Sequence, residues 1–356
     1  MAILPQSRAV VLVQSPGVVK VAVMPTPQPS PTQILIGCSF VGLNPSDTKM
    51  VEAGMPLDSV AGLDFAGVVV SKGANRHTSV KVGDRVCGVA LGYNREDSST
   101  GAFAEYIVAE EHLVLPIPGN MSFEEAATLP VALLTAGMVM YKTLALKCQP
   151  LCDSRHFLVY GGSTTSGIIM IQLLRHSGFR PIAVCSPRNF DLVRAAGAAA
   201  VYDYRSTTCA ADILSLTKNK LVYAVDCITN SESMKICYGA LGSKGGRYVA
   251  LDSFLISGHS RRAVRPSWVF AMSAFGCAVD WVAPYKCGPS LADRDFAENW
   301  FREATLLVHD GIVRPHRYRV VGDSLQSVGE GLKELHRGQV SGVKLVCAVG
   351  NTTRCH

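Results

Sequence analysis

From Arg155 onward, short apolar runs alternate with stretches of helical periodicity, and this order constrains the fold more than any other feature of the chain. A repeated strand–helix order predicts a parallel, doubly wound sheet with helices on both faces. The runs that predict strands are HFLVYGG, RPIAVCS, AAVYDYR, LVYAVDCI and GGRYVALD. One stretch that predicts a helix follows HFLVYGG and ends at His176. The others are NFDLVRAAG, AADILSLTK and SESMKICYGALG.

The segment before Arg155 has a different pattern, because it reads as short strands broken by Pro and Gly. Ser122, with Glu125 three residues later, forms a capping box that opens a helical stretch. Past Phe254 we expect an irregular stretch, then a helix over FAENWFREATLLVHDG and a last strand–helix–strand pattern. The 356 residues therefore predict two domains: a β-rich domain of residues 1–150 and 310–356, interrupted by a Rossmann-like domain of residues 151–309.

Composition excludes several other classes of protein. Hydrophobic residues make up 48% of the chain and charged residues 17%, as in a well-packed globule. The net charge of +6, without a long Lys/Arg run, does not indicate nucleic-acid binding, but it would suit an acidic partner or an anionic cofactor. No run looks long and apolar enough to cross a membrane, and the start MAILPQSRAVVLV lacks the features of a signal peptide.

The twelve cysteines are scattered and form no CxxC pair, which argues against a disulfide framework or a zinc finger. The most metal-like group, Cys148, Cys152 and His156, lacks a fourth ligand nearby, so we expect thiols there and no metal. These features favour a reducing, cytoplasmic location.

Residues 159–174, VYGGSTTSGIIMIQLL, combine a buried strand, a Gly161-Gly162 turn and an apolar helix, as dinucleotide-binding turns do. The usual turn has glycine where Thr164 stands. Backbone N–H groups at a helix start attract an anion whatever the side chains are, and hydroxyls can add hydrogen bonds. The alternative is that the hydroxyls only cap the helix. We interpret the loop as a modified phosphate site formed by Ser163, Thr164, Thr165 and Ser166.

Several motifs resemble a known superfamily when they are taken in order along nearly the whole chain. GLDFAGVVVSKG, VKVGDRVCGVA, GAFAEYIVA, AATLPVALLTAGMVMY and SGVKLV resemble the medium-chain dehydrogenase/reductase superfamily. LNPSDTKM, GGSTTSG, CSPRNFDLVRAAGA and YAVDCITN most resemble the trans-acting enoyl reductases that partner fungal highly reducing polyketide synthases. The resemblance implies an α/β fold in which a Rossmann-like sheet is inserted in a GroES-like β-rich domain.

The resemblance also argues against zinc. The zinc-dependent branch places a cysteine after the third strand and a histidine in a Gly-His-Glu motif. Here Val41 lies in the first region, and the second reads Gly62-Leu63-Asp64. The stretch LGYNREDSSTGAF, where that branch has four structural cysteines, contains none. We therefore expect no metal, which leaves hydride delivery to a polarised carbon–carbon double bond.

The expected nucleotide is NADPH. An NAD site places an Asp or Glu at the end of the second strand of the Rossmann-like domain. This chain has Ser186, Arg188 and Asn189 there, without an immediate carboxylate, and a guanidinium can fork onto a phosphate. Tyr204 resembles the tyrosine that packs against the adenosine phosphate in the family. The alternative for Arg188 is an ordinary solvated side chain.

The resemblance nominates Lys49 and Thr135 as catalytic residues. Lys49 would orient substrate or cofactor oxygens, or be a surface lysine; Thr135 would bond the cofactor amide or a backbone carbonyl. The other cofactor contacts that the resemblance implies are Pro45, Ser46, Asp47, Thr48, Leu251, Asp252, Ser341 and Gly342. The implied substrate pocket also contains Val131, Leu134, Met138, Phe270, Ala271, Met272, Ser273 and Ala274. Residues 270–274 are equally consistent with a core helix or a dimer strand.

Three functions stay open. The first is an enoyl reductase that acts in trans on an acyl chain held by the carrier protein of a polyketide synthase or of a polyketide synthase–peptide synthetase hybrid. A variant of it acts on a released product. The second is a stand-alone NADPH quinone or enone reductase, and the third is a non-catalytic, cofactor-binding synthase subunit. No proton donor can be assigned, so solvent is an option, and we expect a monomer or weak dimer.

A basic cluster precedes residues 270–274. SGHSRRAVRPSW concentrates Arg261, Arg262 and Arg265 in the stretch expected to be irregular. The acidic helix of a carrier protein could dock there, or the arginines could contribute only solubility.

Overall fold

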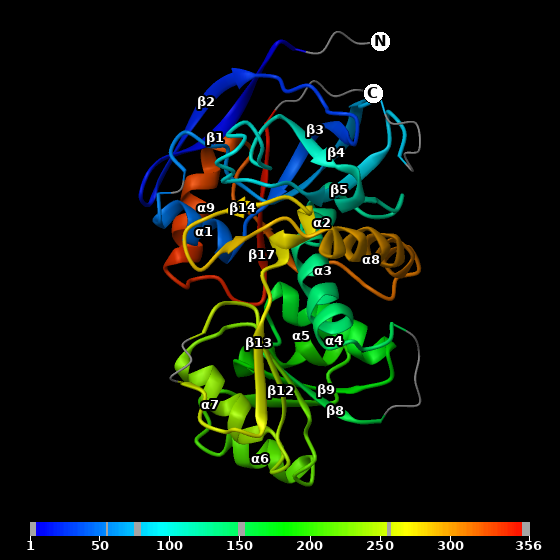
Figure 1. Cartoon of the computed structure of the whole chain (residues 1–356), viewed down its shortest axis with the longest axis vertical. Coiled ribbons are helices and arrows are strands. Elements are labelled where there is room, and N and C mark those ends of the chain that lie inside the picture. The colour runs from blue at the N-terminus through cyan, green and yellow to red at the C-terminus, as the bar shows by residue number, and fades with distance from the viewer. Residues whose placement is uncertain (1–4, 55, 75–79, 149–153, 255–257, 351–356) are drawn as a thin grey trace. The chain divides into compact units, whose positions relative to one another are not determined.

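The computed structural model describes residues 5–54, 56–74, 80–148, 154–254 and 258–350. The chain divides into two compact units (Figure 1). The first unit comprises residues 1–131, 272–309 and 315–356, and the second comprises residues 132–271 and 310–314. Both ends of the chain therefore belong to the first unit.

The second unit is built on one sheet. Its strands are β8 (His156–Tyr160), β9 (Arg180–Cys185), β10 (Ala200–Asp203), β11 (Tyr223–Asp226), β12 (Gly246–Ala250) and β13 (Val264–Trp268). They pair in parallel in the order β10-β9-β8-β11-β12-β13. The helical segments between them are α4 (Thr165–His176), η3 (Pro187–Asn189), α5 (Phe190–Ala195), α6 (Cys209–Leu216) and α7 (Ser231–Ala240).

The strand order reverses direction at β8, which places the connecting helices on opposite faces of the sheet. Figure 1 shows α6 and α7 packed together, away from α4 and α5. Between the sheet and its helices lies a core that includes Leu158, Ile182 and Tyr248. The predicted doubly wound, Rossmann-like sheet is confirmed.

Strand β13 differs from the sequence-based expectation of an irregular stretch after Phe254. Residues Val264–Trp268 pair in parallel with β12 and end the sheet. Pro266 has no N–H to donate, so it is tolerated only because this strand lies at the edge, and its presence hides the strand pattern.

The first unit is rich in short strands. They are β1 (Ser7–Ser15), β2 (Val18–Pro25), β3 (Gln33–Gly42), β4 (Asp64–Lys72), β5 (Arg85–Val89), β6 (Tyr106–Glu110), β7 (Val114–Pro116), β14 (Val279–Asp280), β15 (Lys286–Cys287), β16 (Tyr318–Val320) and β17 (Lys344–Ala348). Its helical segments are α1 (Pro45–Glu52), η1 (Glu111–Leu113), α2 (Phe123–Ala126), α8 (Leu291–His309), η6 (Leu325–Ser327) and α9 (Val328–His336). The segments at the division between the units are α3 (Pro130–Gly137), which continues as the π-helix η2 (Met138–Thr143), and the short helix η5 (Ala271–Phe275).

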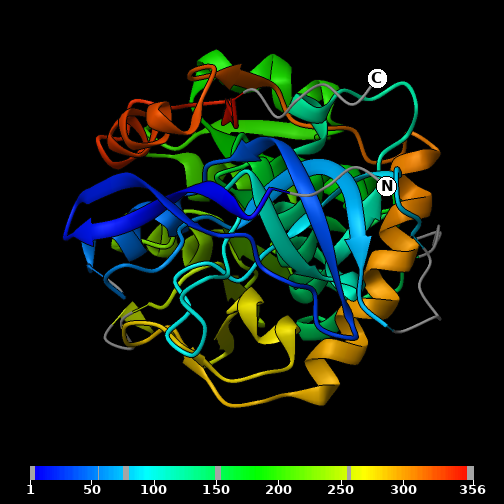
Figure 2. The same ribbon diagram turned by 90° about the horizontal axis from the view of Figure 1, so that it is seen from above.

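The last strand returns to the first sheet. Seven strands form a sheet in the order β16-β17-β3-β4-β5-β7, with β6 also paired to β3, and Cys347 in β17 lies opposite Val41 in β3. Strands β1 and β2 form a separate hairpin, dark blue in Figure 2. The predicted capping box is confirmed, because the Ser122 hydroxyl accepts from the N–H of Glu125 at 3.2 Å and the Glu125 carboxylate accepts from the N–H of Ser122 at 2.9 Å.

The division differs from the expected domain boundaries of residues 151 and 309. Helix α8, orange in Figure 2, packs on η1 and β7 of the first unit. The guanidinium of Arg247 in β12 donates to the carbonyl oxygens of Thr143 and Leu144, which ties the end of η2 to the second unit. These contacts join segments far apart in sequence, so no local pattern reveals them.

One run among the described residues, Phe123–Thr143, has the length and apolar composition that could cross a membrane. The expectation that no such run exists is therefore wrong. Of its most apolar window, 78% is buried inside the protein, which is typical of a core helix.

Candidate functional site

The turn after β8 brings strand and helix unusually close together. Gly161 has φ of +73°, which favours glycine, and a Cβ at Gly167 would lie 2.5 Å from the carbonyl oxygen of Gly161. A Cβ at Gly162 would lie 2.8 Å from the Cβ of Ala183. Sequence reasoning missed Gly167, although its place in the first turn of the helix was a usable signal.

The four loop hydroxyls have different tasks. The Thr164 hydroxyl accepts from the N–H of Gly167 at 3.0 Å and donates to the carbonyl of Gly161 at 2.8 Å, so the capping role applies to this residue. Ser163 accepts from the Asn189 amide at 3.1 Å. Thr165 and Ser166 occupy the first two positions of α4, half-buried.

The main-chain N–H groups of Ser163, Thr165 and Ser166 donate to no acceptor in the described part of the chain. The twelve-residue helix α4 begins at Thr165, so the positive end of its dipole lies at this loop. This arrangement can bind an anion.

A second polar group follows β9 and β10. Register partners Cys185 and Asp203 place the next residues, Ser186 and Tyr204, at the same sheet edge. The neighbouring Arg205 and Ser186 side chains favour the charged form of the Tyr204 phenol and lower its pKa. The Arg205 guanidinium lies 5.2 Å from the centroid of the Tyr204 ring.

Arg188 is exposed in η3, and Asn189 is buried with its amide on Ser163. Sequence reasoning missed Arg205, which could have been found because it directly follows Tyr204. These residues lie at the carboxyl edge of a parallel sheet, the edge where such folds bind ligands.

A buried carboxylate fixes the neighbouring loop. Asp226, at the end of β11, accepts from the N–H groups of Ile228 at 3.0 Å and Thr229 at 2.9 Å. Its other oxygen accepts from the hydroxyls of Ser233 at 2.6 Å and Tyr248 at 2.8 Å. Leu251 donates its N–H to the carbonyl of Asp226 at 3.0 Å, so Leu251 and Asp252 follow β12 at the same edge.

The remaining candidates of the second unit lie on α3, η2 and η5. Leu134, Thr135 and Met138 are almost completely buried, and the Thr135 hydroxyl has no hydrogen bond to any described residue. The turn from α- to π-helix occurs at Met138, and such irregularities are frequent at functional sites. Phe270 lies after the end of β13, with its ring near that of Trp268, and Ala271 begins η5. Neither residue belongs to a strand.

In the first unit, α1 carries the candidates Pro45 to Lys49. Lys49 and Pro45 are exposed, Ser46 is half-buried, and Thr48 is buried with its hydroxyl on the Pro45 carbonyl at 2.8 Å. The Lys49 ammonium lies 5.9 Å from the centroid of the Tyr285 ring.

Asp47 differs from the expected cofactor contact because it has no exposed surface. One carboxylate oxygen accepts from the N–H of Asn44 at 2.7 Å and the other from the Tyr93 hydroxyl at 3.0 Å. Burial raises the pKa of Asp47 to about 7, and the nearby Asp64 acts in the same direction, whereas these hydrogen bonds oppose the rise. Asp47 therefore holds the start of α1.

The other candidates of the first unit lie on three segments. Ser341 and Gly342 precede β17, with Gly342 at φ +68°, and Val131 lies at the start of α3. Met272, Ser273 and Ala274 are buried in η5. The ring of His112 contacts the carbonyl of Ala274 at 3.1 Å, so His112 supports η5, and burial lowers its pKa.

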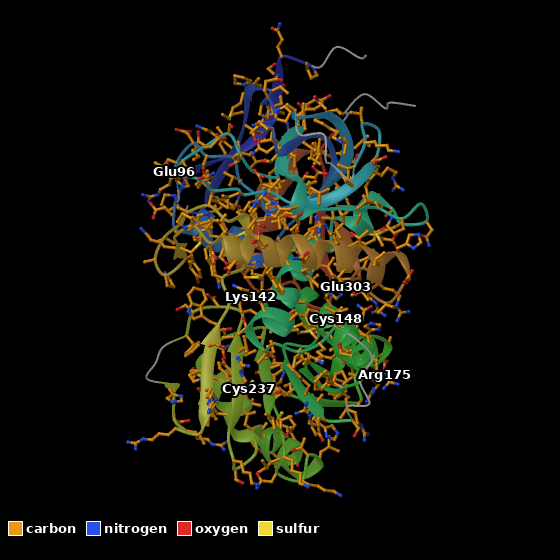
Figure 3. All side chains as sticks on the ribbon, turned by 45° about the vertical axis from the view of Figure 1, so that its right-hand side comes forward. Glu96, Lys142, Cys148, Arg175, Cys237 and Glu303 are labelled. Atoms are coloured by element: carbon orange, nitrogen blue, oxygen red, sulfur yellow. The ribbon has the colours of Figure 1, made fainter. Side chains whose placement is uncertain are left out.

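The two positions at which the zinc-dependent branch has metal ligands carry apolar, buried side chains in this chain. Val41 and Leu63 have no exposed surface. Among the described residues no three His, Cys, Asp or Glu side chains gather as a metal would need. Cys152, of the group with Cys148 and His156, lies outside the described residues. Cys237, labelled in Figure 3, is a buried thiol of α7. Metal independence stays a prediction.

The expected arginine cluster has two different roles. Arg261 donates to the carbonyl oxygens of Tyr238 at 2.6 Å, Leu241 at 2.8 Å and Gly242 at 2.7 Å, so it stabilises the end of α7. Arg262 and Arg265 are exposed, the latter on the edge strand β13. The expectation of one irregular basic loop is wrong in this respect.

Two family models match the chain. The alcohol dehydrogenase GroES-like domain matches residues 30–119, and the zinc-binding dehydrogenase domain matches residues 167–278. Among solved structures, the CurK enoyl reductase matches with a TM-score of 0.76 at 18% identity, over 97% of this chain and all of its own. A mycobacterial protein complexed with NADPH matches with a TM-score of 0.72 at 20% identity, over 96% of this chain and 99% of its own. These structures establish the fold.

Curated relatives match at higher identity. The trans-enoyl reductase opdC of Penicillium oxalicum is 40% identical over 98% of both chains. The trans-enoyl reductase mpsG of Macrophomina phaseolina is 41% identical over 90% of this chain and 92% of its own. The chain therefore belongs to the fungal trans-enoyl reductase family of the medium-chain dehydrogenase/reductase superfamily.

Proposed function

We propose that the protein is a trans-acting enoyl reductase that uses NADPH to reduce the α,β-unsaturated acyl thioester carried by a polyketide synthase. The observation that carries this proposal is the 40% identity to a trans-enoyl reductase over nearly the full length of both chains. The partner is the carrier protein of a polyketide synthase or of a polyketide synthase–peptide synthetase hybrid.

The second unit suits a phosphorylated dinucleotide. The N–H groups of Ser163, Thr165 and Ser166 would receive the pyrophosphate, since they make no other hydrogen bond among the described residues. Ser186, Arg188, Tyr204 and Arg205 would receive the adenosine phosphate, and Ser186 stands where an NAD site needs an acid. When bound, NADPH supplies the hydride.

The chain's own residues bind and orient the reactants. Lys49 would hydrogen-bond substrate or cofactor oxygens from the exposed face of α1, and Thr135 would use its hydroxyl toward the cofactor amide. The buried residues of η5 would line the acyl pocket. Holding the reactants in a productive geometry needs no covalent protein group. We assign protonation of the α-carbon to solvent.

The carrier protein would meet the exposed Arg262 and Arg265. An acidic helix and a basic surface increase the rate of encounter.

An NADPH consumption assay tests the proposal. The protein is given a short enoyl pantetheine thioester or a quinone in separate reactions. Consumption with the thioester and a saturated product supports the proposal. Consumption with the quinone alone would favour a stand-alone quinone reductase, and consumption with neither would favour a non-catalytic subunit.

A further inference from the structure

The first unit contains a buried polar cluster that we define as Asn44, Asp47, Asp64, Tyr93 and Lys344. Asp64 has no exposed surface and Lys344 is only 3% exposed. The two form an ion pair across 280 residues of sequence. Asp64 stands at the acid position of the Gly62-Leu63-Asp64 motif, in which leucine replaces the histidine of the zinc-dependent branch.

Asp64 connects three segments. One of its carboxylate oxygens accepts from Lys344, which begins β17, and from the side-chain amide of Asn44 at 2.9 Å. The other accepts from the N–H of Val131, at the start of α3, at 2.7 Å. One carboxylate thus connects β4 to β17, to the residue before α1 and to Val131, all within the first unit.

Asn44 connects the ion pair to α1, the helix that carries Lys49. Its amide oxygen accepts from the Lys344 ammonium at 2.9 Å, and its N–H donates to Asp47 in the first turn of α1. Tyr93 completes the set by donating to the other oxygen of Asp47 at 3.0 Å. A continuous chain of hydrogen bonds therefore joins the ion pair to the first turn of α1.

Gly42 leaves space for this pair. A Cβ there would lie 2.9 Å from the Cε of Lys344 and 3.1 Å from the Cβ of Asp64, and would overlap the carbonyl of Ala127. The lysine stem passes Gly42, where no side chain obstructs it.

A buried ion pair is a poor source of stability, because desolvation of both charges offsets their attraction, and apolar residues of equal volume often serve as well. Asp64, however, accepts hydrogen bonds from three partners in fixed directions, which an apolar side chain cannot do. We propose that Asp64 and Lys344 are positioning residues that set the placement of Lys49 on α1 for hydride transfer. This inference rests on the proposed function.

The test compares two double variants of the full-length protein. Asp64→Asn with Lys344→Met removes both buried charges at similar volume. Asp58→Asn with Lys20→Met removes an exposed ion pair of 2.9 Å in the same unit and is the matched control. For each, we measure thermal unfolding, the dissociation constant for NADPH and the single-turnover rate of enoyl reduction.

The buried double variant should unfold within about 5 °C of the wild type. Its dissociation constant for NADPH should change less than about threefold, because the adenosine contacts that we propose lie in the second unit. Its single-turnover rate should fall about 100-fold through misplacement of Lys49. The control should match the wild type in all three measurements.

A second variant keeps the test decisive if the buried double variant does not fold. Asn44→Ser keeps a helix-capping residue and the ion pair but removes the link between them and α1. Its turnover should fall about tenfold with unfolding unchanged. Wild-type turnover in a folded variant would overturn the positioning role, whereas an inactive wild type would overturn the proposed function itself.

Discussion

The guanidinium of Arg205 lies 5.2 Å from the centroid of the Tyr204 ring, on the loop that follows β10. Ser186, which follows the neighbouring strand β9, helps to lower the pKa of the Tyr204 phenol, and Arg188 follows Ser186 in η3. Two guanidinium groups and two hydroxyls thus lie on the two loops that follow β9 and β10. Such a set suits a phosphate ester better than a free ribose hydroxyl.

Removal of Arg188 tests the nucleotide preference. Arg188→Ala should weaken binding of NADPH roughly 10- to 100-fold by loss of a charged phosphate contact. Binding of NADH should be little affected, since it lacks that phosphate. Arg194→Ala, which removes an exposed arginine paired with Asp191 at 3.2 Å, is the control. Equal losses for both nucleotides would show that Arg188 is structural.

Local signals predict much of the fold, whereas contacts between distant segments are invisible to them. The capping box of Ser122 and Glu125 spans three residues and is confirmed. The six-residue separation between Gly161 and Gly167 is equally local, although the four intervening hydroxyl residues interrupt the usual glycine pattern. The role of Arg261 depends on where α7 ends, and that of Lys344 on a partner 280 residues away.

Charge reversal tests the carrier-docking surface. Arg262→Glu with Arg265→Glu should slow reduction of a carrier-bound enoyl chain about tenfold at low salt, through a lower encounter rate. Reduction of the same chain on a pantetheine thioester should stay unchanged. Lys218→Glu with Lys220→Glu, both exposed, changes the net charge equally and is the control. Equal slowing of both substrates would show that the two arginines support the fold or pocket.

His316 should make the protein less stable in acid. It is buried, neither ring nitrogen has a hydrogen-bond partner among the described residues, and burial, with Lys344 and Arg317 nearby, lowers its pKa to about 4 from 6.5. The unfolded chain therefore binds a proton below pH 6.5 that the folded chain binds only near pH 4, so stability falls as pH falls through this window.

Comparison with His316→Gln isolates this effect. Between pH 6.5 and 4 the wild type should lose roughly 3 kcal/mol of unfolding free energy relative to the variant. Denaturant unfolding at several pH values measures it. Taking the difference between the two proteins also cancels the contribution of Asp47. Its raised pKa of about 7 stabilises the folded state as the pH falls, opposite to the effect of His316. Parallel pH profiles of the two proteins would contradict the prediction.

Turnover should not need a metal, because Val41 and Leu63 present buried hydrocarbon where the zinc-dependent branch has ligands. Chelator-treated protein should retain its activity within about twofold and hold no stoichiometric zinc by elemental analysis. Zinc that is retained, and whose removal abolishes turnover, would contradict the assignment to the zinc-free branch.

The most direct test of enoyl reduction follows the hydride itself. The protein is given NADPH carrying deuterium at the transferable position of the nicotinamide, together with an enoyl pantetheine thioester, and the product is analysed by mass spectrometry and NMR. We predict a saturated thioester with one deuterium, located at the β-carbon. Unchanged thioester, or a product reduced at the carbonyl with the double bond intact, would contradict enoyl reduction.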